Sequence, residues 1–400
     1  MSTKARTRPT AAFVGVLGFA AILYLAMCAA QPHLPHVLFD YNTWFEREAD
    51  SVLYRVLWLL GDATEPHFQK TLLGGIGVLA GSVIAYLLAK AKSPLAGTTI
   101  CYSSGKWPYV LLASMLSLAL SVALYGGLRF EGDAWIPTFV PYVCVAGAVV
   151  LLYGCTAASV LTGAVLGALL TTPVTMLMRE VICLPAGLPG VIASVSGMWI
   201  GGIIAFELCR ILPWMEPVDY TTPHSGLLAP PPSAEEKSAH PNRFFLRRLL
   251  ADYSEPMFVG NEIAGGMLVL GSMLSWILNP DHPFYGTGWF PALITCQLIT
   301  GAVALYAYWP HWIEGDFFPS FVPVVSVAPA MVLTFGASPF IIVFSAVLGG
   351  LMCPPIANMI NERIPAHWHG MVGFTFSMAF CSFSVGVLLR YILMAFPMLG

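Results

Sequence analysis

Charged residues are scarce in this 400-residue chain, since only 10% of its residues are Asp, Glu, Lys or Arg. A soluble domain carries about 25% charged residues, so this chain lacks the polar side chains that a water-facing surface needs. Hydrophobic residues make up 57% of the sequence. The composition excludes a soluble globular protein and predicts an all-α polytopic membrane protein.

Several chemical signatures are also missing. The nine Cys form no CxxC pair, and most lie inside apolar runs, where Cys behaves as a small hydrophobe. The sequence has no phosphate-binding glycine loop, no nucleophile elbow, no HExxH motif and no basic patch for nucleic acid. We therefore expect no metal, cofactor or nucleic-acid partner, although a membrane enzyme with a dispersed site stays open.

Eleven apolar segments approach the roughly 20 residues that a membrane helix needs. The first, Thr10 to Ala30, follows Lys4, Arg6 and Arg8, and we expect it to be retained rather than cleaved as a signal peptide. The other ten lie at about 71–89, 108–126, 137–154, 157–178, 187–209, 261–278, 289–307, 318–336, 338–360 and 369–393. A Pro-rich linker at 210–249 separates two groups of five, and its composition predicts no ordered structure.

Two stretches of the chain resemble each other. Residues 135–177 align with residues 317–359 without a gap at a shift of 182, and both are apolar runs broken by Pro and Gly. Residues 60–66 align with residues 250–256 at a shift of 190. We infer an internal repeat with copies at 60–209 and 250–400, preceded by a first helix within 1–30 and an extracytoplasmic segment at 31–59.

Five segments per copy, an odd number, predict that the second copy enters the membrane from the opposite side. Lys and Arg test this orientation because they favour cytoplasmic loops. With the N-terminus inside, inner segments hold twelve Lys and Arg and outer segments hold six. We predict two inverted repeats of five helices plus one N-terminal helix, in a bacterial inner membrane with a cytoplasmic N-terminus and linker. The segments at 157–178 and 338–360 contain proline, so either could be a re-entrant or broken helix. If both were re-entrant, each repeat would have four spans and the repeats would be parallel.

An Asp-x-(Ser/Thr)-Glu-Pro motif precedes the first helix of each copy. We expect Thr64 and Ser254 to cap these helices, with each Glu at the positive end of a helix dipole. The alternative is a pair of ion or proton sites, which requires the acids to face a cavity. The residues considered for ion or proton coupling are Asp62, Glu65, Asp252, Glu255, His367 and His369.

The Pro- and Gly-broken helices are the candidate binding site. Proline frees a backbone carbonyl one turn earlier, and freed carbonyls at broken helices hold ions or polar groups in transporters. Small residues also let membrane helices pack closely, and this alternative stays open for the same residues. The predicted substrate-binding set is Thr171, Thr172, Pro173, Thr175, Ser194, Ser196, Cys353, Pro354, Pro355, Asn358, Thr375 and Ser377.

These patterns predict a secondary transporter or channel-like permease for a small polar solute bound near mid-membrane between the two copies. One alternative is a membrane enzyme acting on a lipid-linked or amphipathic substrate through the acids at 62, 65, 131, 133, 252, 255, 314 and 316. Another is a non-catalytic subunit of a membrane complex. The expected partners are the solute and the lipid bilayer, and assembly into a homo-oligomer stays open.

Overall fold

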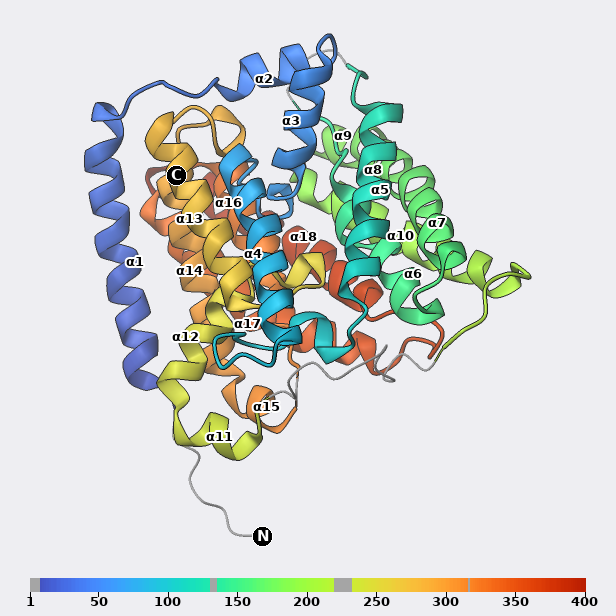
Figure 1. Ribbon diagram of the computed structural model, residues 1–400. Helices are drawn as coiled ribbons and strands as arrows, with labels where there is room; N and C mark the ends of the chain where they lie inside the picture. The colour runs from blue at the N-terminus through green and yellow to red at the C-terminus, as the bar shows by residue number, and fades with distance from the viewer. Residues whose placement is uncertain (1–7, 130–134, 219–231, 316) are drawn as a thin grey trace.

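The structure is a computed structural model that describes residues 8–129, 135–218, 232–315 and 317–400 (Figure 1). All regular elements in these ranges are helices. Those of the first half are α1 (Thr10–Ala30), α2 (Tyr41–Glu48), α3 (Val52–Asp62), α4 (Leu72–Lys90), α5 (Trp107–Tyr125), α6 (Val145–Tyr153), α7 (Ala157–Leu166), α8 (Thr172–Met178), α9 (Leu184–Ala186) and α10 (Gly190–Ile211). Those of the second half are α11 (Ala234–Ala239), α12 (Pro241–Ala251), α13 (Glu262–Leu278), α14 (Phe290–Ala307), α15 (Trp309–Glu314), α16 (Val327–Phe335), α17 (Pro339–Asn361) and α18 (Met371–Ala395).

Eight helices within the described ranges are long and apolar enough to cross a membrane. They are the helix Thr10–His33, α4, α5, the continuous helix Ala157–Ala186, α10, α14, α17 and α18. The other three expected segments form the shorter apolar helices Val140–Tyr153, Glu262–Leu278 and Val322–Phe335. The all-helical membrane class is thus confirmed, whereas the total of eleven spans stays a prediction.

The N-terminal helix α1 stands at one edge of the molecule and packs against α14 and α12 (Figure 1). Phe13 stacks on Tyr306 of α14 with 4.3 Å between the ring centroids. Large apolar side chains such as Phe19 and Ile22 are exposed on this helix. An apolar helix with such an exposed surface is suited to contact lipid, where its backbone groups are satisfied within the helix.

Helices α4 and α13 make the most extensive contact between any two helices of the described chain. Glycine brings their backbones together, because a Cβ at Gly81 would lie 2.9 Å from the Cα of Ala264. Small residues at such crossings allow the close packing that stabilises helix pairs in membranes. Each of these helices directly follows one copy of the acidic motif, so their contact holds the two motifs in a fixed relation.

The paired central segments break at corresponding places. A 3-10 turn precedes α6 and another precedes α16, at Val140–Val143 and Val322–Val325. Helix α6 ends at Gly154 with a φ of 86°, and α16 ends at Gly336 with a φ of 106°. Glycine adopts these angles without a Cβ clash, which explains why it occupies both ends.

The prolines expected to break the next helices do not interrupt them. A π turn over Gly167–Thr171 precedes Pro173, and the helix continues as α8. Such a turn changes the spacing of the backbone hydrogen bonds and so accommodates a residue that cannot donate one. Helix α17 contains Pro354 and Pro355 without a break. The helix breaks therefore lie at the ends of α6 and α16 rather than at these prolines.

The segment predicted as a disordered linker, 210–249, contains helix at its end. Ser233 caps α11, because its hydroxyl accepts the N–H of Glu236 at 3.1 Å. The Lys237 ammonium lies 4.8 Å from the ring centre of Trp312, which ties α11 to α15. Residues 219–231 of the linker lie outside the described residues. The expected lack of order thus does not extend to α11 and α12.

Candidate functional site

A cavity of about 300 Å³ is lined by residues from both halves of the chain. Its wall is mostly apolar, with eight aromatic side chains and two Glu, and no described Lys, Arg or His lines it. Many lining residues occur as pairs separated by 180 to 190 positions. These pairs are Glu65 and Glu255, Pro66 and Pro256, Phe68 and Phe258, Tyr102 and Tyr285, Phe139 and Phe321, Val143 and Val325, and Met198 and Met378.

Four of the aromatic lining residues have a left-handed backbone. The φ angles are 62° at Phe68, 55° at Tyr102, 58° at Phe258 and 58° at Tyr285. Residues other than glycine rarely adopt such angles, which cost of order 1–3 kcal/mol each and concentrate at functional sites. The same strain therefore recurs at paired positions around one cavity. It orients the aromatic side chains so that they line the cavity.

The first acid cluster consists of Asp62, Glu65 and Lys70. Asp62 ends α3, Glu65 begins a 3-10 turn, and Lys70 precedes α4. The Lys70 ammonium pairs with Asp62 and lies 2.6 Å from Glu65 Oε2. All three side chains are buried. Two carboxylates and one ammonium give this cluster a formal charge of −1 when all three are ionised.

Side chains from a distant segment complete the first acid cluster. The Thr138 hydroxyl donates to Asp62 Oδ2 at 2.7 Å, and the Trp135 indole N–H donates to Glu65. The Lys70 ammonium lies 3.5 Å from the ring centre of Trp58, a cation–π contact. Burying a charge is costly unless it is paired and hydrogen-bonded, and these contacts supply such partners.

The second acid cluster consists of Asp252, Glu255 and Arg248. Arg248 Nη2 lies 2.8 Å from Asp252 Oδ1, and Arg248 Nη1 lies 3.0 Å from Glu255 Oε2. The Ser320 hydroxyl donates to Asp252 Oδ1 at 3.0 Å. Phe317 lies beside Arg248, with 5.7 Å between the guanidinium carbon and the ring centre. This cluster also carries a formal charge of −1 when fully ionised.

The hydroxyls expected to cap helices close turns instead. Thr64 accepts the N–H of Thr71 at 2.8 Å, and Ser254 accepts the N–H of Asn261 at 2.8 Å. Thr71 and Asn261 are the N-cap residues directly before α4 and α13. The capping expectation is therefore wrong, since each Glu-Pro pair lies in a 3-10 turn ahead of the helix. This placement lets Glu65 and Glu255 reach the cavity.

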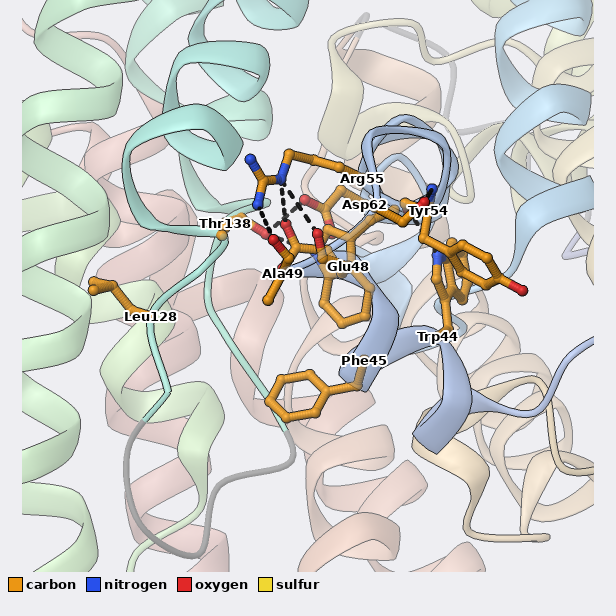
Figure 2. A network of polar contacts seen from close by, with 12 residues as sticks. Trp44, Phe45, Glu48, Ala49, Tyr54, Arg55, Asp62, Leu128 and Thr138 are labelled. Atoms are coloured by element: carbon orange, nitrogen blue, oxygen red, sulfur yellow. Dashed lines mark hydrogen bonds and ion pairs between the residues drawn. The ribbon is translucent and has the colours of Figure 1, made fainter.

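A further buried acid, Glu48, braces α2 and α3 next to the first acid cluster. Figure 2 shows Arg55 directed at Glu48 and Ala49, with Asp62 and Thr138 nearby. Arg55 Nε lies 3.2 Å from Glu48 Oε1, and Arg129 Nη2 lies 3.1 Å from Glu48 Oε2. Two guanidinium groups thus neutralise one carboxylate here. Because Glu48 is doubly paired and does not line the cavity, we regard it as structural.

The Asp residue of each acid cluster has a raised pKa, unlike an Asp in an ordinary surface ion pair. Asp252 and Asp62 lie outside the helices long enough to cross a membrane. Burial raises the pKa of Asp252 to about 7, although Arg248 acts in the opposite direction. Burial also raises the pKa of Asp62 well above its usual range, with Lys70 opposing it. Each cluster has one carboxylate more than it has cations, and a proton can neutralise that excess.

The two histidines considered for coupling lie apart from the acid clusters. His367 Nε2 lies 2.8 Å from Glu207 Oε1, at a partly exposed position. His369 is buried, and its ring meets the cavity residue Phe258 edge-on with 5.6 Å between centroids. Of the acids in the enzyme alternative, Glu314 ends α15. The others outside the clusters, at 131, 133 and 316, lie outside the described residues.

Two members of the predicted substrate-binding set, Ser194 and Thr375, line the cavity. Others make contacts between or within helices: the Thr172 and Ser121 hydroxyls lie 2.9 Å apart, and Ser377 donates to a carbonyl of α17 at 2.8 Å. The members that are not cavity-lining residues are Thr171, Thr172, Pro173, Thr175, Ser196, Cys353, Pro354, Pro355, Asn358 and Ser377. Their binding role stays a prediction.

Sequence reasoning missed the cations and the indole that hold the cavity glutamates. Lys70 aligns with Gly260 and Arg248 aligns with Trp58, so neither cation has a charged counterpart in the other copy. Trp135 was visible only as the start of an aligned stretch. A charge present in one copy and absent from the other was the available signal, because it marks a place where the two copies differ chemically.

No protein-family model matches the chain, and no curated protein matches it. Within the described residues, no group of three or more His, Cys, Asp or Glu side chains is arranged to hold a metal ion. The fold and the site together describe a helical membrane protein with a mainly apolar cavity and two buried acid clusters at its wall.

Proposed function

We propose that the protein is a secondary transporter or channel-like permease that holds a small solute in this cavity. The observation that carries the proposal is that one Glu from each half of the chain lines the same cavity, and each belongs to a cluster with an Asp and a buried cation. Ionisable groups inside membrane proteins are costly and commonly mark transport pathways. A site formed by corresponding elements of two halves is the arrangement many transporters use.

An inverted repeat is part of the proposal. The contacts that support it recur at aligned positions: Thr138 and Ser320 donate to the Asp of their own cluster, and Thr64 and Ser254 close the same turn. In this arrangement the two acid clusters approach the cavity from opposite membrane sides. Rocking of one half against the other would then expose the cavity alternately, as in other carriers built from inverted repeats.

The acid clusters are the proposed coupling sites. Each cluster carries a formal charge of −1 when fully ionised, and one proton can neutralise it. Each cluster also includes a Glu on the cavity wall. Proton binding and solute binding at one carboxylate are mutually dependent, since the two compete for the same charge. The binding site we propose is therefore the cavity between the two motifs, with Ser194 and Thr375 as its small polar wall residues.

The test begins with thermal unfolding of the purified protein in detergent against a panel of solutes at two pH values. A ligand that binds the folded state raises the unfolding midpoint by mass action. A solute that stabilises the wild type should stabilise Glu65→Gln less and Glu46→Gln equally, because Glu46 is exposed on α2.

The same solute should be taken up by proteoliposomes that contain the wild-type protein, and Glu65→Gln should reduce the uptake. Uptake that is unaffected by Glu65→Gln and Glu255→Gln would place the pathway outside the cavity. Stabilisation by lipid-like compounds alone, with no flux of any solute, would favour the membrane enzyme or the complex subunit.

A further inference from the structure

We infer that the solute is an amphipathic organic cation, with an apolar or aromatic body and an ammonium-type head. This inference rests on the proposed transport function and specifies its cargo. Three features of the cavity support it: the charge of its wall, its aromatic side chains with their backbone conformation, and the acceptor sites of Glu255.

The charge of the wall is of one sign. Glu65 and Glu255 line the cavity, while the cations that pair with them, Lys70 and Arg248, are absent from its wall. Each pair belongs to a cluster that also contains Asp62 or Asp252, so neither cation neutralises a cluster in which both carboxylates are ionised. A bound anion would meet two carboxylates with no lining cation, whereas a bound cation would offset part of the negative charge and favour the ionised form of each Asp.

Aromatic side chains form much of the remaining wall. They include Phe68 and Tyr102 from the first half and Phe258 and Tyr285 from the second half, together with Trp135, Phe139, Phe321 and Phe374. Aromatic faces attract cations, and the attraction reaches about 2 kcal/mol or more when the site is desolvated. Strongly hydrated small ions gain little from such a wall, so the wall favours a cation whose charge is carried on an apolar body.

One of the two lining carboxylates, Glu255, has acceptor sites left for a ligand. Glu65 Oε1 accepts from the Trp135 indole and Oε2 from Lys70 Nζ, and the side chains of Tyr285 and Asp62 also bond to this carboxylate, so its acceptor sites are largely used. Glu255 Oε2 accepts from Arg248 Nη1. An ionised carboxylate has about four acceptor sites, so Arg248 does not saturate Glu255, and this carboxylate can face an ammonium head.

Four of the wall aromatics are held by a left-handed backbone. Phe68, Tyr102, Phe258 and Tyr285 all have φ between 55° and 62°. Strain of this kind persists where the surrounding structure enforces it, and it concentrates at ligand clamps. Its repetition at paired positions indicates an aromatic enclosure that is built in advance of binding.

The experiment compares three probes of similar size on the detergent-purified full-length protein: benzyltrimethylammonium, benzyl alcohol and phenylacetate. Their dissociation constants are measured by thermal-shift titration and isothermal calorimetry. We expect benzyltrimethylammonium to bind at least tenfold more tightly than the neutral and anionic probes. Equal binding of all three probes, or preference for phenylacetate, overturns the inference without need of any variant.

Variants then localise the charge selectivity. Glu65→Gln and Glu255→Gln keep the size and one acceptor oxygen of the side chain and should each weaken cation binding roughly tenfold, which corresponds to about 1.4 kcal/mol. Binding of benzyl alcohol should stay the same. The control Glu46→Gln, at an exposed position, should leave all three affinities unchanged. Selectivity that survives both cavity variants overturns the assignment.

Transport is tested separately from binding. Proteoliposomes loaded at one pH and diluted at another are assayed for accumulation of labelled benzyltrimethylammonium. Selective binding with accumulation supports both the cargo class and the transport function. Selective binding with no movement of the cation supports the site chemistry and refutes transport of this cargo, whereas movement of another solute without cation selectivity refutes the cargo class and leaves the transport function standing.

Discussion

The two acid clusters keep the same acids and exchange the position of the cation. In the first, Lys70 follows the motif and Trp58 precedes it; in the second, Arg248 occupies the position equivalent to Trp58, and Gly260 that of Lys70. Both arrangements place a cation within 3.0 Å of the Glu on the cavity wall. A buried Asp–Glu pair thus needs one cation, and the chain supplies it from either side of the turn.

The exchange also explains an unusual backbone. Lys70 has a φ of 45°, and Gly260 at the equivalent position has a φ of 67°. Glycine adopts this conformation at little steric cost, whereas the same conformation is strained in Lys. The first cluster therefore keeps a strained residue because its ammonium is needed, and the second cluster dispenses with it because Arg248 performs the pairing.

The largest effect is expected from removing the buried cation. Lys70→Met leaves Asp62 and Glu65 buried without their partner, and the loss of one member of a buried ion pair costs about 3–5 kcal/mol. Arg248→Met should destabilise the protein to a similar extent. Chemical unfolding in detergent measures both. A loss below about 1 kcal/mol for either variant would show that its acids are already neutral in the folded protein.

A double variant tests whether the two arrangements are interchangeable. Lys70→Gly with Trp58→Arg copies the second cluster into the first. The Arg at position 58 replaces a buried Trp, so we expect a net loss, but the two substitutions should compensate each other in part. The measurement is the coupling energy of a double-mutant cycle. Independent, additive losses would mean that the position of the cation is fixed in each cluster.

The pH dependence of stability should expose Asp252. The pKa of Asp252 is raised to about 7 in the folded protein by burial, and an unfolded Asp titrates near pH 3.9. The folded state therefore binds the extra proton between these values, and the stabilisation it gives is lost as pH rises through about 7. The free energy of unfolding should fall between pH 5 and 7 by at most about 1.4 kcal/mol per pH unit.

Two matched variants show which carboxyl group causes the pH dependence of the free energy of unfolding. Asp252→Asn removes the titrating group, so the dependence between pH 5 and 7 should flatten. Asp62→Asn leaves Asp252 in place, so the part of the slope that belongs to the second cluster should persist. Unfolding curves at pH 5, 6 and 7 provide the comparison. An unchanged slope in Asp252→Asn would assign the titration to another group.

A smaller difference between the clusters is the indole that reaches only one of them. Trp135 donates to Glu65, and the aligned residue in the other copy is Phe317, which has no donor. Trp135→Phe should cost about 1.5–3 kcal/mol, the range for a hydrogen bond to a charged group. Phe317→Tyr, which adds a hydroxyl next to Arg248, serves as the counterpart. A Trp135→Phe protein as stable as the wild type would show that Lys70 and the other partners hold Glu65 without the indole.

Sequence reasoning could predict what depends on local pattern. Apolar length located the eight helices that are long and apolar enough to cross a membrane in the described ranges, and alignment of the chain with itself located both acidic motifs. It could not predict that Trp135 reaches Glu65 across 70 residues, because such contacts are made by tertiary packing. It also misplaced the helix breaks, since a π turn before Pro173 compensates locally for the missing donor. The cavity itself depends on residues from both halves and became visible only when they were brought together.

The smallest effect is expected at the hydroxyls that support each Asp. Thr138 accepts from the Trp58 indole at 3.0 Å and donates to Asp62, whereas Ser320 donates to Asp252 and lies 3.4 Å from Arg248 Nε. Ser320→Ala should cost about 1 kcal/mol, since Arg248 still pairs with Asp252. Thr138→Val keeps the side-chain shape and should cost somewhat more, because it leaves the indole and one carboxylate oxygen unsatisfied. Equilibrium unfolding of the two variants decides the order, and a larger loss for Ser320→Ala would mean that the second cluster depends more on its hydroxyl than on its guanidinium.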